Sequence, residues 1–427
     1  MLSILTLNAQ VQIGAWIVGE NFMNLSGNSV SMPDANTLAI GAPINDGFGL
    51  FEAGHVRAYS WSGTAWVQKG VDIDGEAIED WSGTSVSMPD ANTLAIGAPG
   101  NDGNGSDAGH ARVFSWSGTA WVQKGADIDG WSPYNQSGYS VSMPDANTLA
   151  IGAPGNDGNG IGVGHARVYS WSGTAWGQKG ADIDGEAGGD WSGCSVSMPD
   201  ANTLAIGARD NDGNGLDAGH ARVYSWSGTA WVQKGVDIDG EASFDWSGYS
   251  VSMPDANTLA IGARDNDGNG LDAGHARVYS WSGTAWVQKG VDIDGEAVGD
   301  LSGHAVSMPD ANTLAIGALG NNSFLPLPDA GHTRVYSWSG TAWGQKGIDI
   351  DGWSPYNQSG YSVSMPDANI LAIGAPAADS GRGHTIVYSL ATIGDAENSL
   401  LATLKLYPNP ASSVINVEVD AEHFDVP

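Results

Sequence analysis

One phrase recurs along this chain at a nearly constant interval. The stretch Ser85 to Ala98, SVSMPDANTLAIGA, returns with few changes, and its copies are marked by Met32, Met88, Met143, Met198, Met253, Met308 and Met365. Neighbouring copies are separated by 55 to 57 residues. A repeat of this length predicts one structural unit that occurs seven times. The units should share one body, because each buries little surface alone.

Each copy is expected to contain four β-strands, which we call a, b, c and d. In the second copy, alternating or mostly apolar runs predict them at residues 84–88, 93–98, 110–116 and 121–129. Short turns separate a from b and c from d, whereas residues 99–109 form a long glycine-rich loop between b and c. Four antiparallel strands repeated seven times predict an all-β fold, a seven-bladed β-propeller of four-stranded antiparallel blades.

The two ends of the repeat region predict how the ring closes. The last copy ends after its strand c, His384 to Leu390, and residues 11–20 align in register with residues 67–76, the strand d region of the first copy. We therefore expect the N-terminal strand to complete the last blade, so that residues 10–392 form a closed ring.

The long loops are expected to gather on one face of this ring. In an a-b-c-d meander the b–c and d–a connections lie on one face, and both are long here, whereas the a–b and c–d turns on the other face are short. Binding residues usually sit on such loops, so we expect any site on the loop-rich face.

Composition excludes some partners. The chain has 48 acidic and 16 basic residues, a net charge of −32, which repels phosphate backbones and makes nucleic acid an improbable partner. It could instead collect divalent cations. There is no apolar stretch long enough for a transmembrane helix, and we expect a monomer. The single cysteine, Cys194, forms no internal disulfide and is interpreted as a tolerated substitution, since other copies carry Thr84, Tyr139, Tyr249 or Tyr361 there.

The b–c loops contain oxygen-rich Asn-Asp-Gly sequences that are candidate calcium sites. Hard cations prefer such oxygen ligands, although Asx-Gly sequences are also simply good turns. The candidate calcium ligands are Asn101, Asp102, Asn104, Asp107, Asn211, Asp212, Asn214, Asp217, Asn266, Asp267, Asn269 and Asp272.

Two sets of aromatic residues recur. Pairs such as Trp61 and Trp66 flank the c–d turn and are interpreted as fillers between blades. A second set lies in the d–a loops, where tryptophan near carboxylates suits a sugar site but also pins a loop. These candidate ligand-binding residues are Trp81, Trp131, Trp191, Trp246 and Trp353.

Histidine begins strand c in all seven copies. The seven are His55, His110, His165, His220, His275, His332 and His384. They could bind metal, but neighbouring copies should lie too far apart to share an ion. We favour a structural role in which each histidine pairs with an aspartate of its own blade, Asp127 in the case of His110.

The repeat resembles a known family. Ser-Gly-Tyr-Ser-Val-Ser, then Leu-Ala-Ile-Gly-Ala-Pro at residues 149–154 and Gly-His-Ala-Arg-Val-Tyr-Ser at residues 164–170, together resemble the FG-GAP repeat of the integrin alpha-subunit propeller. The family's calcium loops lie between strands a and b, where this chain has only Met-Pro-Asp-Ala-Asn. Its calcium sites are therefore not transferred, and any calcium here should lie on the opposite face.

The two termini suggest export. Residues 1–9 are apolar and end in a small residue, as does the end of a secretory signal; we expect that its first part is missing from this sequence. Residues 393–427 resemble a linker and a truncated type A sorting domain of the type IX secretion system, on the motif Tyr407, Pro408, Asn409 and Pro410. This resemblance implies interaction with that secretion machinery in a Bacteroidetes-type bacterium, and a secreted or cell-surface protein.

The function expected from these features is non-catalytic binding. No catalytic motif stands out, and a single active site should break the repeat at one blade. We expect an adhesion or binding propeller whose loop-rich acidic face takes a protein or polysaccharide, with calcium as a possible aid. The alternatives are a secreted polysaccharide-active enzyme and a purely structural spacer. The irregular segments, residues 131–136, 322–328 and 353–358, are the first places to seek a unique pocket.

Overall fold

The recurring phrase forms the two inner strands of each blade. In the computed structural model of this chain, which describes residues 10–158, 160–322, 328–390, 403–408 and 415–420, the second copy folds into β8 (Ser85–Asp90), β9 (Thr93–Ala98), β10 (His110–Trp116), β11 (Trp121–Gln123) and β12 (Ile128–Asp129). Their order is β8-β9-β10-β11, with β12 also beside β10. Each blade thus has four antiparallel strands, the outermost in two segments.

The other blades repeat this arrangement. Blade 1 contains β3 (Ser29–Asp34), β4 (Thr37–Ala42), β5 (His55–Trp61), β6 (Trp66–Gln68) and β7 (Ile73–Asp74). Blade 3 contains β13 (Ser140–Asp145), β14 (Thr148–Ala153), β15 (His165–Trp171), β16 (Trp176–Gln178) and β17 (Ile183–Asp184). Blade 4 contains β18 (Ser192–Asp200), β19 (Thr203–Ala208), β20 (His220–Trp226), β21 (Trp231–Gln233) and β22 (Ile238–Asp239). Blade 5 contains β23 (Ser247–Asp255), β24 (Thr258–Ala263), β25 (His275–Trp281), β26 (Trp286–Gln288) and β27 (Ile293–Asp294).

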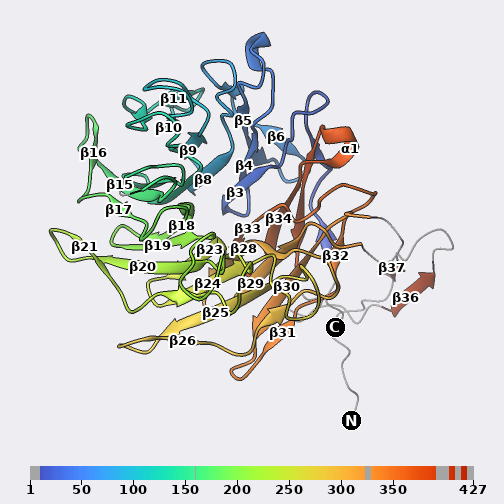
Figure 1. The fold of residues 1–427 in the computed structure, drawn as a ribbon. Helices are drawn as coiled ribbons and strands as arrows, with labels where there is room; N and C mark the ends of the chain where they lie inside the picture. Colours follow the sequence, from blue (N-terminus) through green and yellow to red (C-terminus); the bar gives the residue numbers. More distant parts are fainter. Residues whose placement is uncertain (1–9, 159, 323–327, 391–402, 409–414, 421–427) are drawn as a thin grey trace, which may run out of the picture. The chain divides into compact units, whose positions relative to one another are not determined.

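Blade 6 contains β28 (Ser302–Asp310), β29 (Thr313–Ala318), β30 (His332–Trp338), β31 (Trp343–Gln345) and β32 (Ile350–Asp351). Blade 7 contains β33 (Ser362–Asp367), β34 (Ile370–Ala375) and β35 (His384–Ser389). Two short helical turns, η1 (Gly47–Gly49) and α1 (Ala378–Gly381), lie in the b–c loops of blades 1 and 7. Figure 1 shows the blades in chain order around a ring, from blue through green to orange.

The N-terminus closes the ring, as the sequence predicts. β1 (Val11–Gln12) and β2 (Ile17–Val18) pair antiparallel with β35 of blade 7. Val11 lies opposite Ser389 and Val18 opposite His384. β1 and β2 therefore supply strand d of the last blade.

A chain of hydrogen bonds joins the seven innermost strands. The serine before each methionine accepts the N–H of the corresponding methionine in the next blade, for example Ser31 Oγ from Met88 at 2.9 Å. The series closes where Met32 N–H donates to Ser364 Oγ at 2.9 Å. The Ser-Val-Ser-Met sequence therefore recurs because every blade needs it to contact the next.

The hydrophobic core is divided among the gaps between blades. Leu94 and Ile96 of strand b are fully buried, and each cluster combines residues of two neighbouring blades. The cluster between blades 2 and 3 contains Ala95, Ala111, Val113, Ile128, Val141, Met143, Leu149, Ile151 and Tyr169. No blade has a core of its own, so the seven units stabilise one another.

Three local predictions require correction. Strand a extends through Asp90, leaving a two-residue turn in which Asn92 N–H donates to Asp90 Oδ1 at 2.7 Å. Strand d is interrupted between β11 and β12. Because this interruption adds two residues to the outer strand, the Cα partner of His110 is Asp129 and not Asp127. The predicted pairing of Trp116 with Trp121 is confirmed.

The long loops lie on one face, as predicted. The d–a loop bonds to the b–c loop of the preceding blade: Glu79 N–H donates to Phe51 O at 2.9 Å, and Trp81 N–H donates to Glu52 O at 3.2 Å. Equivalent bonds join Trp246 to Asp217 and Leu301 to Asp272. We call this surface the loop-rich face.

A separate unit contains the C-terminal segment. Its described residues form a hairpin of β36 (Thr403–Pro408) and β37 (Ile415–Asp420). Tyr407 and Pro408 of the predicted sorting motif end β36. Asn409, Pro410 and residues 1–9 lie outside the described residues. No helix among the described residues has the length and apolar character needed to cross a membrane.

Candidate binding site at the centre of the loop-rich face

One residue from each blade lines a cavity at the centre of the ring. It follows the Ser-Gly pair that begins strand a, and the seven residues are Asn28, Thr84, Tyr139, Cys194, Tyr249, His304 and Tyr361. Together with Arg209 they enclose about 170 Å³. We call this the axial pocket.

The glycine before each of these residues places it at the axis. Gly83 has φ of +91°, and a Cβ there would meet the carbonyl oxygen of His55 at 2.6 Å. A side chain is therefore excluded by both the backbone conformation and the close approach of the neighbouring strand. The fold fixes the place of the axial residue but leaves its identity free.

Blades 4 and 5 break the repeat beside this pocket. Where four copies end strand b with Gly-Ala-Pro, these two have Gly-Ala-Arg, with Arg209 and Arg264. Twelve of the sixteen basic residues belong to the repeat, namely Lys69, Lys124, Lys179, Lys234, Lys289, Lys346, Arg57, Arg112, Arg167, Arg222, Arg277 and Arg334. Arg209 and Arg264 therefore do not belong to the set of basic residues that recurs in the blades.

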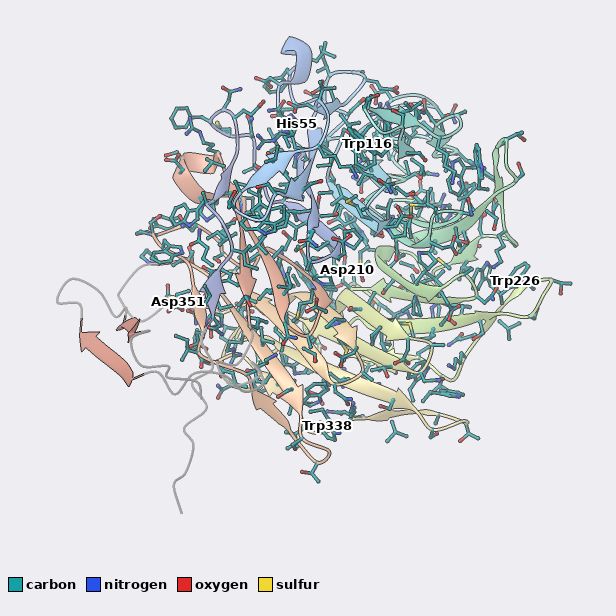
Figure 2. All side chains as sticks on the ribbon, turned by 180° about the vertical axis from the view of Figure 1, so that it is seen from behind. His55, Trp116, Asp210, Trp226, Trp338 and Asp351 are labelled. Atoms are coloured by element: carbon teal, nitrogen blue, oxygen red, sulfur yellow. The ribbon has the colours of Figure 1, made fainter. Side chains whose placement is uncertain are left out.

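Arg209 lies among aromatic rings of two blades. Its guanidinium carbon is 4.5 Å from the ring centroid of Trp191, 5.2 Å from that of Trp246 and 5.7 Å from that of Tyr249. Its Nε donates to Asp210 Oδ2 at 3.5 Å. Figure 2 shows Asp210 near the middle of the ring, whereas Trp226 and Trp338 lie at its periphery.

Arg264 continues the cluster toward blade 6. Its guanidinium carbon is 4.8 Å from the centroid of Trp246 and 4.4 Å from that of Tyr249. Its Nη1 is 3.3 Å from His304 Nδ1, and the His304 ring is 4.6 Å from that of Tyr361. Two guanidinium groups and five aromatic rings thus form one connected group, which we call the arginine–aromatic cluster.

Burial sets the protonation states in this cluster. It raises the pKa of Tyr249 and of Tyr361, so both hydroxyls are protonated at neutral pH and can donate hydrogen bonds. Burial, and secondarily the charge of Arg264, lowers the pKa of His304 well below its usual value, so the imidazole is neutral and can accept from Arg264.

Cys194 has a buried side chain that lies near two backbone carbonyl groups. Burial raises the pKa of its thiol, and Sγ lies 3.4 Å from Gly207 O and 3.5 Å from Gly248 O. A protonated, buried thiol is unreactive. Its interpretation as a substitution at the start of strand a agrees with this geometry, and its position on the axial pocket is new.

The structure divides the five predicted tryptophans. Trp191 and Trp246 join the arginine–aromatic cluster, while Trp81 has the same place in blade 2 and donates from Nε1 to Glu52 Oε2 at 3.2 Å. Trp131 and Trp353 lie instead at the seams, by which we mean the places where the outer strands of one blade pack against the next blade. The ring centroid of Trp131 is 3.8 Å from the guanidinium carbon of Arg167, and the Trp353 ring is 5.8 Å from that of Trp16.

Trp131 also lines a second hollow, of about 330 Å³. It lies at the seam of blades 2 and 3, and Asp127, Asp129 and Trp176 are among its other lining residues. Trp131 is 63% exposed. Aspartates and aromatic rings line this hollow, whereas Arg209 lines the axial pocket.

The predicted calcium ligands use much of their bonding capacity inside their own loops. Asn101 Oδ1 accepts from Gly103 N–H at 2.9 Å, and Asp102 Oδ1 accepts from Asp107 N–H at 2.9 Å. Asn104 donates to Gly130 O at 2.9 Å. The equivalent bonds recur in the loops of Asn211, Asp212, Asn214 and Asp217 and of Asn266, Asp267, Asn269 and Asp272. Calcium binding by these loops stays a prediction.

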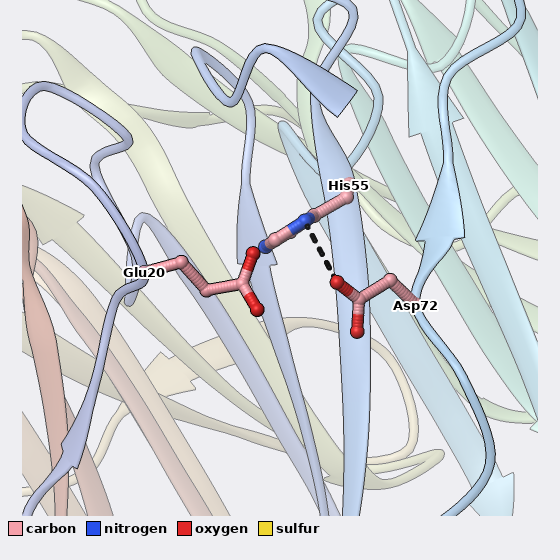
Figure 3. A group of neighbouring side chains, drawn as sticks. All are labelled: Glu20, His55 and Asp72. Atoms are coloured by element: carbon pink, nitrogen blue, oxygen red, sulfur yellow. Dashed lines mark ion pairs between the residues drawn. The ribbon is translucent and has the colours of Figure 1, made fainter. Parts of the chain in front are cut away.

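Acidic and histidine side chains gather repeatedly at the blade seams, where they could hold metal ions. In each group the histidine of strand c meets carboxylates of the outer strand and, in most blades, a glutamate of the preceding blade. Figure 3 shows His55 between Glu20 and Asp72; His55 Nδ1 is 3.6 Å from Asp72 Oδ2. Burial lowers the pKa of His55 and of its six equivalents to about 4. Asp127, the predicted partner of His110, is not its Cα partner but does lie in such a group with His110 and Glu76, and the glutamate was not predicted.

The tryptophan pairs at the c–d turns are structural, as interpreted. Trp116 and Trp121 lie 5.4 Å apart between ring centroids. Trp121 Nε1 donates to Lys69 O of the preceding blade at 2.8 Å, and the ammonium of Lys69 is 5.1 Å from the Trp116 ring. These contacts join neighbouring blades at the periphery.

The arginine–aromatic cluster was missed by reasoning from the sequence. The signal was present in the change from Pro to Arg at the end of strand b in two adjacent copies. Among the segments singled out instead, residues 323–327 lie outside the described residues. The other two contain Trp131 and Trp353, which lie at seams.

Comparison with known proteins agrees with the fold. Residues 67–114 match the FG-GAP repeat family, and a search of curated proteins found no match. A solved complex of KlAtg21 with the coiled coil of AgAtg16 is 12% identical over 85% of this chain and 94% of that chain, with a TM-score of 0.52. A putative 6-phosphogluconolactonase from Bacteroides uniformis is 8% identical over 78% of this chain and 91% of that chain, with a TM-score of 0.49.

The likeness to the KlAtg21 complex extends to the fold alone. The chain contains an FG-GAP repeat within a seven-bladed β-propeller. None of the comparisons supports the resemblance of residues 393–427 to a sorting domain, which stays a prediction.

Proposed function

We propose that this propeller is a non-catalytic binding protein that takes a terminal acidic sugar of a glycan at the axial pocket. The carrying observation is the arginine–aromatic cluster, in which Arg209 and Arg264 depart from the repeat and lie against Trp191 and Trp246. Arginine pairs with carboxylates through two parallel hydrogen bonds, and tryptophan offers a face on which a sugar ring can pack. This combination suits an acidic sugar better than a neutral one.

The size of the pocket supports a single sugar unit. Its volume of about 170 Å³ is below the ~300–1,000 Å³ of usual small-molecule sites. An internal stretch of a polysaccharide would not fit, whereas one end group would.

The charge of the protein argues in the same direction. With a net charge of −32, the chain repels a polyanion at a distance. An isolated acidic group at the end of an otherwise neutral chain meets far less repulsion, and it gains the two local guanidinium groups. The acidic hollow that contains Trp131 would disfavour such a ligand.

Calorimetric titration with three small probes tests this proposal. Glucuronate should bind, while glucose and the methyl ester of glucuronate should bind at least about tenfold more weakly, because each lacks the carboxylate that the arginines recognise. Equal binding of the acid and its ester, or no binding of the acid, would contradict the proposal.

A second candidate is an enzyme that cleaves glycans carrying the same acidic sugar. The observation in its favour is the neutral imidazole of His304 beside Arg264 and two tyrosines, since a neutral imidazole can accept a proton while arginine neutralises a carboxylate. Incubation of the protein with glucuronate-terminated oligosaccharides, followed by mass spectrometry, separates the two functions. The binding protein leaves the oligosaccharides intact, and shortened or unsaturated products would establish the enzyme.

We also propose an extracellular location, on the basis of residues 1–9 and of Tyr407, Pro408, Asn409 and Pro410. Binding of a terminal glycan unit suits a protein that meets glycans outside the cell. Immunodetection in the culture medium and on intact cells tests this part, and a protein found only inside the cells would contradict it.

A further inference from the structure

The blade seams contain buried histidines whose ring nitrogens have no hydrogen-bond partner. His55 and His220 are each 1% exposed, and neither Nδ1 nor Nε2 of either ring is hydrogen-bonded. A buried polar group without a partner costs about 1–3 kcal/mol. That the same arrangement occurs in two blades indicates that something at these seams satisfies the imidazoles.

Each of these histidines faces carboxylates from two directions. At the seam of blades 7 and 1, one ligand atom each of Glu20, His55 and Asp72 lie within 4.8 Å of one another, and at the seam of blades 3 and 4 the same holds for Glu186, His220 and Asp237. The glutamate comes from the preceding blade and the other two residues from the following one.

The distances are too long for hydrogen bonds but suit a shared ion. His55 Nδ1 is 3.6 Å from Asp72 Oδ2, and His220 Nδ1 is 3.9 Å from Glu186 Oε2. Two ligands that each lie roughly 2.0–2.2 Å from one metal ion are separated by roughly 3.3–4 Å. The gaps between these side chains therefore have the dimensions of a coordination site.

Neighbouring side chains hold one oxygen of a carboxylate and leave the other directed at the histidine. Asp72 Oδ1 accepts from Gln68 Nε2 at 2.6 Å, so Oδ2 is the atom that faces His55. Glu186 Oε1 lies 3.7 Å from Arg222 Nη1, so Oε2 faces His220. Such outer contacts orient ligands in metal sites.

We propose that these two seams each bind a divalent transition-metal ion of the zinc type, through Glu20, His55 and Asp72 and through Glu186, His220 and Asp237. One imidazole and two carboxylates form a ligand set that suits zinc and its neighbours, whereas calcium prefers oxygen ligands alone. Each ion joins two adjacent blades, so it contributes to the stability of the ring and is independent of the axial pocket.

Two other seams show how the site is lost. At the seam of blades 2 and 3, Trp131 stands where other blades have the glutamate, and Arg167 takes both oxygens of Asp182 at 3.0 Å. At the seam of blades 6 and 7, the ring of His384 stacks on Trp16 at 4.8 Å. His384 therefore provides a matched control within the same chain.

Titration of the metal-free protein with zinc chloride tests the proposal. The variant His55→Gln/His220→Gln should lose two equivalents of bound zinc relative to the unchanged protein, or bind them at least about tenfold more weakly. His384→Gln should retain them. Calcium chloride should not replace zinc at these two sites.

A second variant guards against loss of folding. Glu20 and Glu186 are about half exposed, so Glu20→Gln/Glu186→Gln should fold normally and still lose the same two equivalents. No zinc uptake by the unchanged protein, or equal uptake by the unchanged protein and both double variants, would overturn the proposal. Loss of the same equivalents in His384→Gln would also overturn it.

Discussion

Blades 2 and 5 have the same backbone on the loop-rich face but different chemistry. Trp81 and Trp246 have φ of 53° and 54°, and both precede the Ser-Gly pair of strand a. In blade 2 the indole bonds to Glu52, a carboxylate, and the neighbouring loop begins with Pro99. In blade 5 the centroid of the indole ring is 5.2 Å from the guanidinium carbon of Arg209 and 4.8 Å from that of Arg264. The repeat thus fixes where the tryptophan lies, and the change from Pro to Arg in two copies decides which charged groups surround it.

The arginines should have the largest effect on this difference. In Arg209→Ala/Arg264→Ala, affinity for a glucuronate-terminated oligosaccharide should fall by about 100-fold or more, because charge-assisted hydrogen bonds contribute about 1.5–3 kcal/mol each. Calorimetry provides the measurement. Arg382→Ala removes an arginine from the b–c loop of blade 7 and should leave affinity unchanged; an equal loss there would show that only net charge matters.

The two tryptophans allow the most direct pairwise test. Trp246→Ala should lower affinity for the same oligosaccharide by about 30-fold, since stacking and the support of a guanidinium each contribute about 1 kcal/mol. Trp81→Ala, at the same position of blade 2, should bind as the unchanged protein does. Similar losses in both variants would remove the distinction between the blades.

The seam histidines of blades 2 and 5 should have the same effect on the pH dependence of stability. His110 in blade 2 and His275 in blade 5 both have a pKa lowered to about 4 by burial. Protons therefore bind preferentially to the unfolded chain, and stability present above about pH 6.5 is lost as the pH falls toward 4. Between pH 7 and 5 each histidine should account for on the order of 2 kcal/mol of this loss.

Denaturation in urea at pH 7 and pH 5 measures this effect in the metal-free protein. His110→Gln and His275→Gln should each reduce the pH dependence by the same amount and leave glycan affinity unaltered. Burial raises the pKa of Asp129 and of Asp294 beside these histidines. Protonation of these carboxyl groups favours the folded chain, so their effect on stability is opposite to that of the histidines and occurs at lower pH. Unequal slopes for the two variants would show that the seams of the two blades differ.

The smallest effect is expected at Cys194. Blade 2 has Thr84 at this position, and its Oγ1 donates to Trp81 O at 2.8 Å. Cys194→Thr should therefore make the equivalent bond and change the free energy of unfolding by about 1 kcal/mol or less. A larger loss in urea denaturation would mean that the axial residues are less interchangeable than the shared backbone implies.

The architecture could be predicted from the sequence because every blade repeats the same pattern of strands and turns. Strand c, the Trp116–Trp121 pair and the closure by residues 11–18 all follow from alternation and register. The interruption of strand d at residues 124–127 was not predicted, because these residues continue the mixed polar pattern of an outer strand and only the hydrogen bonds show the break.

The candidate site was harder to predict for a physical reason. Its residues come from strand ends that are far apart in sequence, such as Tyr139, Arg209 and His304, and only ring closure brings them to one axis. Repetition also directed attention to features that recur, whereas Arg209 and Arg264 matter because they do not. The glutamates at the seams were missed likewise, since each contacts a histidine of the next blade.

The central claim is that the arginine–aromatic cluster of blades 4 and 5 binds an acidic sugar end group. A crystal structure of the protein with a glucuronate-terminated disaccharide tests it most directly. The account predicts the carboxylate within hydrogen-bond distance of Arg209 or Arg264 and the sugar ring over Trp191 or Trp246. A disaccharide bound instead at the loops of blade 2, or in the hollow beside Trp131, would contradict it.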